Sequence, residues 1–206
     1  MKESESEAII RHNRVNFLKQ HDLSEDMAVL VNLEYGGDNY RRYASVDKRY
    51  GGDGITRASS LISDSLFTDK NNLALFLPLA DCIGAVLYSP KNQAMGVAHL
   101  GRHNLIQEGG IRNIEYMKQK FGSSPQDITV FLSAAAGNRS YPLYDFENRS
   151  LHEVAVEQLV KAGVLRQNID VDRRDTTSDE SLFSHSNFLA GTQETDGRHA
   201  IVAIMR

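Results

Sequence analysis

The chain alternates short runs of apolar residues with stretches in which apolar residues recur every three or four positions. Short continuous apolar runs are typical of buried strands, and they predict strands at residues 27–31, 73–79, 85–88, 94–98, 128–132, 169–171 and 200–205. The three- and four-residue spacing predicts helices over residues 7–20, 106–121 and 151–162. Gly122 and Gly163 follow the second and third of these helices, as glycine commonly does at a helix end.

This order of elements indicates a mixed fold. Some strands follow one another directly, with residues 89–92 as a hairpin turn, and others alternate with helices. We therefore expect an α/β (α+β mixed) fold, in which a layered mixed sheet is flanked by helices. A length of 206 residues suits one domain, so residues 1–206 are predicted to form a single domain. The polar stretch 35–54 is interpreted either as a loop that lines a site or as a solvated excursion.

Amino-acid composition and net charge exclude some classes of binding partner. The chain has 41% hydrophobic and 24% charged residues, as globular proteins do, and its net charge of −4 gives no basic field to attract nucleic acid. A single cysteine excludes an internal disulfide and fits a reducing compartment. Residues 1–7 are acidic and unlike a secretory signal, and no run approaches the roughly 20 apolar residues that cross a membrane. We expect a cytoplasmic protein without nucleic-acid or membrane partners.

The single cysteine stands where an apolar run turns polar. Asp81 and Cys82 follow the strand at 73–79, and His99 ends the strand at 94–98. If these strands are neighbours, a thiol and an imidazole meet, which is the minimum for a zinc site or for a thiol nucleophile with its base. Asp81 is a further catalytic candidate, because an acid at a strand end seldom serves core packing. The alternative is structural, since free cysteines are commonly small buried apolar residues.

Arg102 follows in a glycine-containing loop that leads into the second predicted helix. A phosphate or carboxylate at that point would be held by Arg102 and by the free amide groups of the helix start; the alternative is a solvated loop. Asp175 and Thr176 are interpreted as caps of turns. The histidines without supporting partners in the sequence are interpreted as surface residues: His12, His21, His152 and His199.

These residues resemble the motifs of the laccase-domain family, the YfiH-type proteins once called multicopper polyphenol oxidases and now regarded as zinc-dependent purine nucleoside phosphorylases. The family pattern has Ala-Asp-Cys at a strand end, then His-Ala-Gly-Trp-Arg-Gly, and a late Phe-Phe-Ser-Tyr-Arg-Arg segment before a Gly-Arg strand. The matching positions, in the same order, are Ala80-Asp81-Cys82, His99-Leu100-Gly101, Leu182-Phe183-Ser184-His185 and Gly197-Arg198. The similarity runs from about residue 8 to residue 205 and implies the layered mixed fold of that family.

The resemblance implies a catalytic zinc held by two histidines and one cysteine, with the fourth position open. Cys82 and His99 match two of these ligands, whereas Tyr35 stands where the family has its first ligand histidine. His103 or His185 would then supply the third nitrogen. Zinc is the expected cofactor, with copper as the less favoured metal and a metal-free site as a further alternative.

The resemblance also implies the reaction and its small-molecule partners. We expect an enzyme that cleaves the glycosidic bond of a purine nucleoside with phosphate, with adenosine deamination as an additional activity. The residues expected to bind substrate or phosphate are Arg102, Tyr35 and Arg198. The residues expected to be catalytic are Cys82, His99 and Asp81. The chain is expected to act as a monomer or a homodimer.

Departures from the family pattern keep two other functions open. Trp-Arg-Gly is replaced by Arg102-His103-Asn104, and Gly-Pro-Ser-Ile-Gly by residues 133–137. The family fold resembles that of thiol-dependent toxin deamidases, in which case the cysteine and histidine would act as nucleophile and base on an amide without metal. The third function is that of a catalytically decayed member that keeps a small-molecule pocket. True laccase chemistry is not expected, because a multicopper oxidase needs many more histidines than the seven present.

Overall fold

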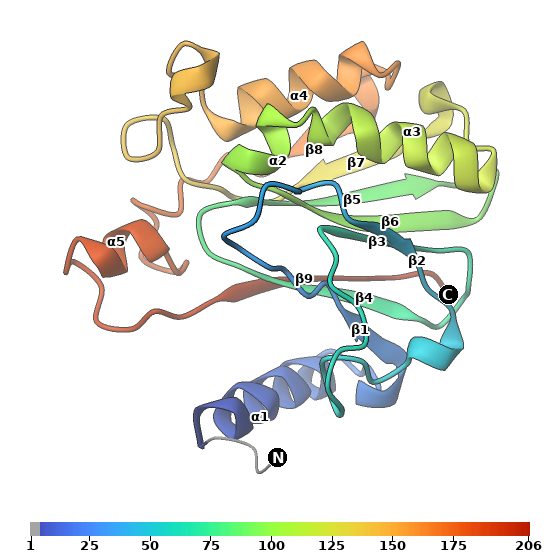
Figure 1. Ribbon diagram of the computed structural model, residues 1–206, viewed down its shortest axis with the longest axis horizontal. Helices are drawn as coiled ribbons and strands as arrows, with labels where there is room; N and C mark the ends of the chain where they lie inside the picture. Colours follow the sequence, from blue (N-terminus) through green and yellow to red (C-terminus); the bar gives the residue numbers. More distant parts are fainter. Residues whose placement is uncertain (1–4) are drawn as a thin grey trace.

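The computed structural model describes residues 5–206 and shows four layers (Figure 1). Helices cover the outer face of a six-stranded sheet, a three-stranded sheet packs on its other face, and the first helix closes the opposite side. This arrangement confirms the predicted mixed fold with helices flanking a layered sheet. Residues 1–4, the greater part of the acidic opening, lie outside the described residues, and so does the expectation drawn from them about a secretory signal.

The three-stranded sheet has the order β1-β4-β9, with β1 parallel and β9 antiparallel to the central strand. Its members are β1 (Ala28–Leu30), β4 (Ala74–Leu79) and β9 (His199–Ile204). Side chains alternate along β4, so Phe76 shares a cluster with Leu18 of α1 (Glu5–Gln20), while Leu75 and Leu77 pack against the larger sheet. Burial on both faces explains why β4 reads as a continuous apolar run.

The larger sheet has the order β2-β3-β6-β5-β7-β8 and mixes parallel with antiparallel pairs. Its strands are β2 (Tyr43–Ser45), β3 (Ser65–Thr68), β5 (Ile83–Ser89), β6 (Ala94–Leu100), β7 (Thr129–Leu132) and β8 (Ile169–Val171). The helices on its outer face are α2 (Arg102–Ile106), α3 (Gly109–Phe121) and α4 (Leu151–Lys161). Every residue of β6 is buried, because this strand lies between two strands and two layers.

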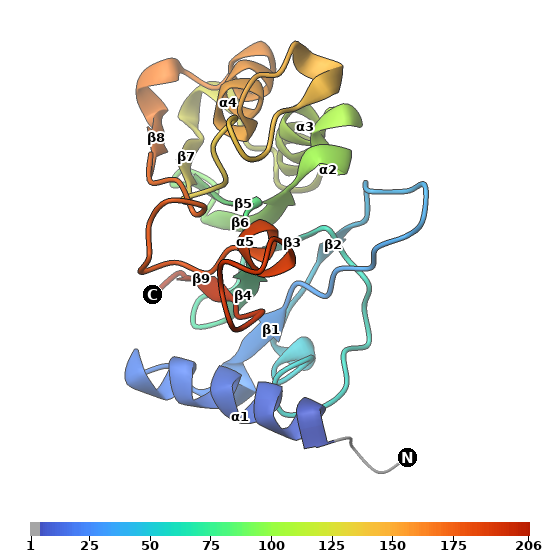
Figure 2. The same ribbon diagram turned by 90° about the vertical axis from the view of Figure 1, so that its left-hand side faces the viewer.

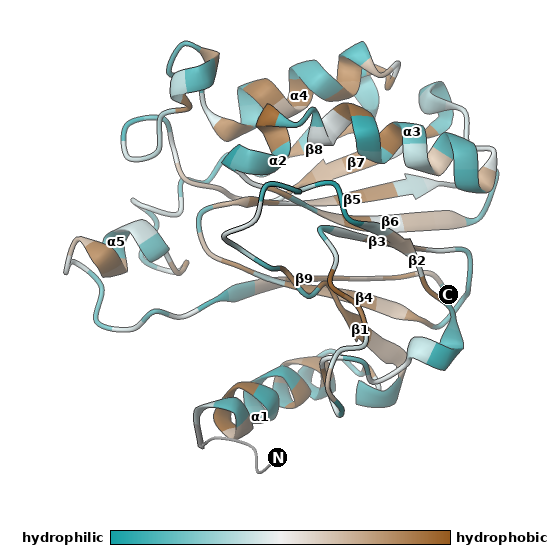
Figure 3. Ribbon diagram, viewed as in Figure 1, coloured by the Kyte–Doolittle hydropathy of each residue, from teal (hydrophilic) through white to brown (hydrophobic). Residues whose placement is uncertain are grey.

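The ends of the helices follow from local sequence. Ser150 accepts a hydrogen bond from the amide of Glu153, and the Glu153 carboxylate accepts one from the amide of Ser150, so a capping box starts α4. Gly122 ends α3 in the left-handed conformation, at φ 70°, which glycine adopts without steric cost. The apolar faces of α3 and α4 turn towards the sheet, and their polar faces turn outwards (Figure 3).

Some elements differ from the sequence-based prediction. The helix expected over 106–121 is confirmed as α3, which begins later, at Gly109, because Glu108 takes the left-handed conformation (φ 62°). The separate short helix α2, which ends at Ile106, is not predicted. The polar stretch 35–54 contains the edge strand β2, and neither β3 nor α5 (His185–Leu189) is predicted, since segments this short show no clear period. Within residues 5–206, no helix has the length and apolar character needed to cross a bilayer.

One end of the two sheets gathers segments that are far apart in the sequence. The turn between β4 and β5, the start of α2, the 133–146 loop and α5 lie at this end, on the left in Figure 1 and facing the viewer in Figure 2. The amides of Ala136 and Ser186 and the hydroxyl of Thr176 donate hydrogen bonds to Asp81 in the β4–β5 turn, and these bonds join the segments. Cys82 and His99 both lie at this end.

Candidate functional site

Cys82 and His99 meet because β5 and β6 pair as an antiparallel hairpin. Gly84 lies opposite His99 in the register, so Cys82, which precedes β5, lies beside Gly101, which follows β6. Cys82 Sγ and His99 Nε2 are both within 3.3 Å of the point that a Cβ atom on Gly101 would occupy. The thiol and the imidazole therefore share one site. They are brought together by β5 and not by β4, which belongs to the other sheet.

The imidazole of His99 is buried and uncharged. The residue is 4% exposed, and its backbone amide donates to the carbonyl of Asp64 at 2.9 Å. The ring of Tyr35 lies edge-on to it, with 6.3 Å between ring centres. Burial lowers the pKa of His99 to about 4, opposed by Asp64 and Asn104, so the imidazole is neutral at pH 7. Its Nδ1 has no hydrogen-bond partner among the described residues.

The thiol of Cys82 is uncharged as well. Burial, followed by the negative charge of Asp81, raises the pKa of Cys82 to about 12, although Arg102 and Arg198 act in the opposite direction. The residue is only partly exposed. A thiol hydrolase attacks the amide bond of its substrate as a thiolate, which is usually paired with an imidazolium. The surroundings of Cys82 and His99 favour neither charged form.

We expect the buried imidazole to make the protein less stable in mild acid. The folded-state pKa of His99 lies below its ordinary value of 6.5, so the unfolded chain binds more protons between the two values. The contribution of His99 to the free energy of unfolding is complete above pH 6.5, and it falls by about 3 kcal/mol as the pH drops to about 4. Chemical denaturation of the wild type and of His99→Gln measures it as the difference between their pH profiles. Parallel profiles would contradict the expectation.

Asp81 holds three segments together. It is 3% exposed and takes the left-handed conformation, at φ 75°. Its carboxylate accepts hydrogen bonds from the hydroxyl of Thr176 at 2.8 Å and from the amide of Ser186 at 2.7 Å, and its carbonyl accepts one from the amide of Ala136 at 2.8 Å. Both carboxylate oxygens are engaged by the protein, so the geometry suits a positioning role. Direct catalysis by Asp81 stays a prediction.

Asp81→Ala is expected to lower the free energy of unfolding by about 3 kcal/mol, because it leaves two donors without acceptors and places alanine in a left-handed conformation. Asp81→Asn is the matched control. Asparagine tolerates this conformation and keeps an acceptor, so we expect a loss of about 1 kcal/mol. Amide hydrogen exchange should rise most in residues 176–190. Equal losses for the two variants, or unchanged exchange in that segment, would refute the positioning role.

The cap interpretation of Asp175 and Thr176 is confirmed for the first residue only. Asp175 accepts hydrogen bonds from the amides of Gly137 and Thr177, both at 2.9 Å. Thr176 is buried and donates its hydroxyl to Asp81, so it belongs to the network described above.

Arg102 is a cation of the site without a protein anion. Its guanidinium lies over the ring of Tyr141 at 4.6 Å and near that of Tyr144 at 6.0 Å. Within residues 5–206 it makes no ion pair or hydrogen bond, and its Nε is buried. Arg198, by contrast, pairs with Asp196. An unpaired guanidinium held flat by aromatic rings is suited to bind a phosphate or carboxylate group.

The sequence model of the multi-copper polyphenol oxidoreductase laccase family matches residues 1–146. The chain belongs to this family. The resemblance seen in the motifs is thereby confirmed. The matched part of this laccase-family chain includes Tyr35, Cys82, His99 and Arg102, whereas the segment that binds the Asp81 carboxylate follows it.

Curated relatives of this laccase-family chain are named purine nucleoside phosphorylases. YlmD of Bacillus subtilis is 26% identical over 145 residues, which are 62% of this chain and 51% of that protein. The phosphorylase of Clostridium acetobutylicum is 29% identical over 135 residues, which are 60% of this chain and 56% of that protein. The chain thus spans about half the length of these relatives.

Two solved structures show the same fold. The hypothetical protein YfiH of Bacillus licheniformis superposes with a TM-score of 0.86 at 22% identity. YlmD of Geobacillus stearothermophilus superposes with a TM-score of 0.83 at 20% identity. Each comparison covers 97% of this chain and 82% of the other.

The zinc site that the laccase-domain resemblance implies lacks a third donor in this structure. His103 is exposed and stacks on Tyr40, with ring centres 4.7 Å apart. His185 hydrogen-bonds to Asp196 at 2.9 Å. In the described part of the chain, no three His, Cys, Asp or Glu side chains are grouped to hold a metal ion. The donor set therefore does not fit a three-ligand zinc site.

A buried ion pair that the sequence analysis does not single out holds the 34–42 loop beside His99. Arg42 donates to both carboxylate oxygens of Asp64, at 2.8 and 3.0 Å, and Asp64 is 1% exposed. Arg42 also donates to the carbonyl of Glu34 at 2.7 Å. The only sign of this pair in the sequence is an acidic residue, Asp64, directly before β3. Arg42 lies 22 positions away, so the pairing becomes visible only in the folded chain.

The surface interpretation of four histidines is half correct. His12 and His21 are exposed. His152 is half-buried on α4, and its Nε2 pairs with the carbonyl of Ser133 at 2.7 Å. Both ring nitrogens of His199 are buried without a partner among the described residues.

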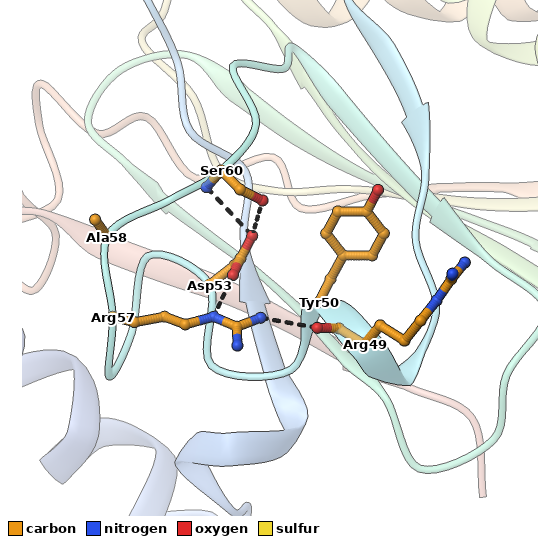
Figure 4. Close-up of a pocket in the computed structure, with 6 residues that line it drawn as sticks. All are labelled: Arg49, Tyr50, Asp53, Arg57, Ala58 and Ser60. Atoms are coloured by element: carbon orange, nitrogen blue, oxygen red, sulfur yellow. Dashed lines mark hydrogen bonds and ion pairs between the residues drawn. The ribbon is translucent and has the colours of Figure 1, made fainter.

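Two cavities lie away from Cys82 and His99. One of about 370 Å³ is lined by Arg49, Tyr50, Asp53, Arg57, Ala58 and Ser60 (Figure 4). Its buried carboxylate, Asp53, is already bound by Arg57 and Ser60. The other, of about 350 Å³, lies on the sheet surface around Val86, Phe131 and Asp170. Neither gathers unpaired chemistry-bearing groups, so the candidate site stays with the thiol, the imidazole and Arg102.

Proposed function

We propose that this chain is a purine nucleoside phosphorylase that works at the site formed by Cys82, His99 and Arg102. An oxygen of inorganic phosphate forms a bond to C1′ of the ribose while the bond from C1′ to N9 of the purine breaks. The electron pair of that bond goes to the purine, which takes up a proton. The products are ribose 1-phosphate and the free base. The observation that carries the proposal is the unpaired Arg102 guanidinium beside the thiol–imidazole pair.

Arg102 is assigned to phosphate. A guanidinium presents several N–H groups in a planar fork that matches phosphate oxygens, so it both binds and orients the attacking group. No carboxylate within residues 5–206 competes for this charge. The names of the curated relatives, which are purine nucleoside phosphorylases, support the same assignment.

Tyr35 is assigned to the purine. The residue is 67% exposed, so its ring is open to a ligand that enters from solvent. Desolvation of the phenol, followed by the nearby Cys82, raises the pKa of Tyr35 to about 12. The phenol and the Cys82 thiol therefore keep their protons at pH 7 and serve as hydrogen-bond donors to the leaving base.

The test is phosphate-dependent release of base. The full chain is incubated with inosine, guanosine or adenosine, with and without inorganic phosphate, and the free base is quantified by chromatography. We expect release from at least one nucleoside at a rate that rises with phosphate. Release that is independent of phosphate, or nucleoside binding without release, would contradict the proposal. Conversion of adenosine to inosine would reveal the additional deaminase activity.

A further inference from the structure

We propose that this chain forms no resident zinc centre, because Tyr35 occupies the place of the missing ligand, and that exchange of this one side chain for histidine creates the centre. The inference goes beyond the proposed reaction. The experiment measures metal binding, so the inference about zinc can fail while phosphorolysis is observed. Phosphorolysis can likewise be absent while the inference about zinc holds.

The two donors that are present converge on one point. Gly101 has no side chain, and the point where its Cβ would lie is 2.9 Å from Cys82 Sγ and 3.3 Å from His99 Nε2. An alanine at this position would clash with both side chains. The sulfur and the nitrogen therefore lie close enough together to share one ligand, and what the site lacks is a third donor.

Neither of the other candidate histidines supplies that donor. His103 is held flat against Tyr40, whose amide donates to Gln107 at 3.1 Å and whose carbonyl accepts from Asn104 at 3.2 Å. Tyr40, on which His103 stacks, is thus held in place by these hydrogen bonds. His185 pairs with Asp196 through Nδ1, and in the described part of the chain it is not grouped with Cys82 and His99 as a third ligand.

The position next to His99 carries a phenol. The Tyr35 ring lies edge-on to the imidazole at 6.3 Å between centres, and its phenol is near enough to Cys82 to feel the charge of a thiolate there, so this side chain adjoins both donors. Cysteine, histidine, aspartate and glutamate are the usual protein ligands of zinc, and phenols are not among them. Two donors hold zinc weakly, because each lost metal–ligand bond lowers the affinity. Position 35 is therefore where a third donor is missing.

The experiment measures zinc content by mass spectrometry after equilibrium dialysis against about 1 μM free zinc, a concentration that saturates ordinary three-donor sites. Six proteins are compared: the wild type, Cys82→Ser, Tyr35→His, Tyr35→Cys, the double variant Tyr35→His with Cys82→Ser, and Tyr144→His. Tyr144 is the matched control because its exposed fraction of 72% is close to the 67% of Tyr35 and it lies near another side chain of the site, with the Arg102 guanidinium 6.0 Å from its ring centre.

We expect one zinc per chain in Tyr35→His, bound at least about 100-fold more tightly than in the wild type. The double variant and Tyr144→His should stay near the wild-type level. One zinc in the wild type that disappears in Cys82→Ser would overturn the proposal. If Tyr35→His is folded by circular dichroism yet stays empty, and Tyr35→Cys does too, then position 35 is not the missing ligand and the proposal fails.

Discussion

Arg102→Met is expected to lower kcat/KM for phosphate by a factor of about 100 to 1000, while the dissociation constant of the nucleoside changes little. Methionine keeps an apolar contact with Tyr141 but removes the unpaired charge that we assign to phosphate. Steady-state kinetics at varied phosphate measure the first quantity. Calorimetric titration of the nucleoside without phosphate measures the second.

Two controls separate charge from structure at this position. Arg102→Lys keeps the charge and loses the planar fork, so an intermediate loss of about tenfold is expected. Lys120→Met removes an exposed cation from the last turn of α3, at the opposite end of the sheets, and should leave the kinetics unchanged. If Arg102→Met stays within about threefold of the wild type at low phosphate, the phosphate role of Arg102 is wrong.

Gly101→Ala is expected to lower kcat/KM for phosphorolysis about 100-fold, because the added methyl group clashes with the thiol and the imidazole and displaces one of them. The new carbon would stand 2.9 Å from Cys82 Sγ and 2.9 Å from His99 Cε1, so one of these side chains has to move. The φ of Gly101 is −92°, which alanine adopts without strain. The loss of stability should therefore stay near 1 kcal/mol, mostly from the changed helix cap.

Gly37→Ala is the matched control for this variant, because a β-carbon there meets no atom within 4 Å. It should leave activity and stability unchanged. Kinetic constants and chemical denaturation of both variants give the comparison. Wild-type turnover in Gly101→Ala would show that displacement of Cys82 or His99 does not affect the reaction.

Much of the fold could be predicted because buried strands need apolar side chains, and runs of such residues are visible in the sequence. Strands β4 and β6 lie between two layers, so both read as continuous apolar runs. Strands β2 and β3 escape prediction since they have three and four residues and include polar side chains. Ser65 and Thr68 are fully buried only because β3 pairs with β6, and sequence spacing cannot express such pairing.

The candidate site could be predicted in part for a similar reason. Cys82 and His99 are unusual side chains at the ends of apolar runs, and a hairpin register brings them together. The groups that hold the site in place come from distant segments. Asp81 binds the amide of Ser186, 105 positions away, and this contact exists only in the folded chain.

The central claim is that phosphate, and not water, attacks the ribose at this site. Phosphorus NMR of the wild-type chain with a purine nucleoside and inorganic phosphate tests it most directly. We expect a ribose 1-phosphate signal to grow as the phosphate signal falls, and Arg102→Met to slow this exchange by the factor of about 100 to 1000 given above. Free base and free ribose with an unchanged phosphate signal, or no conversion of any purine nucleoside, would contradict it.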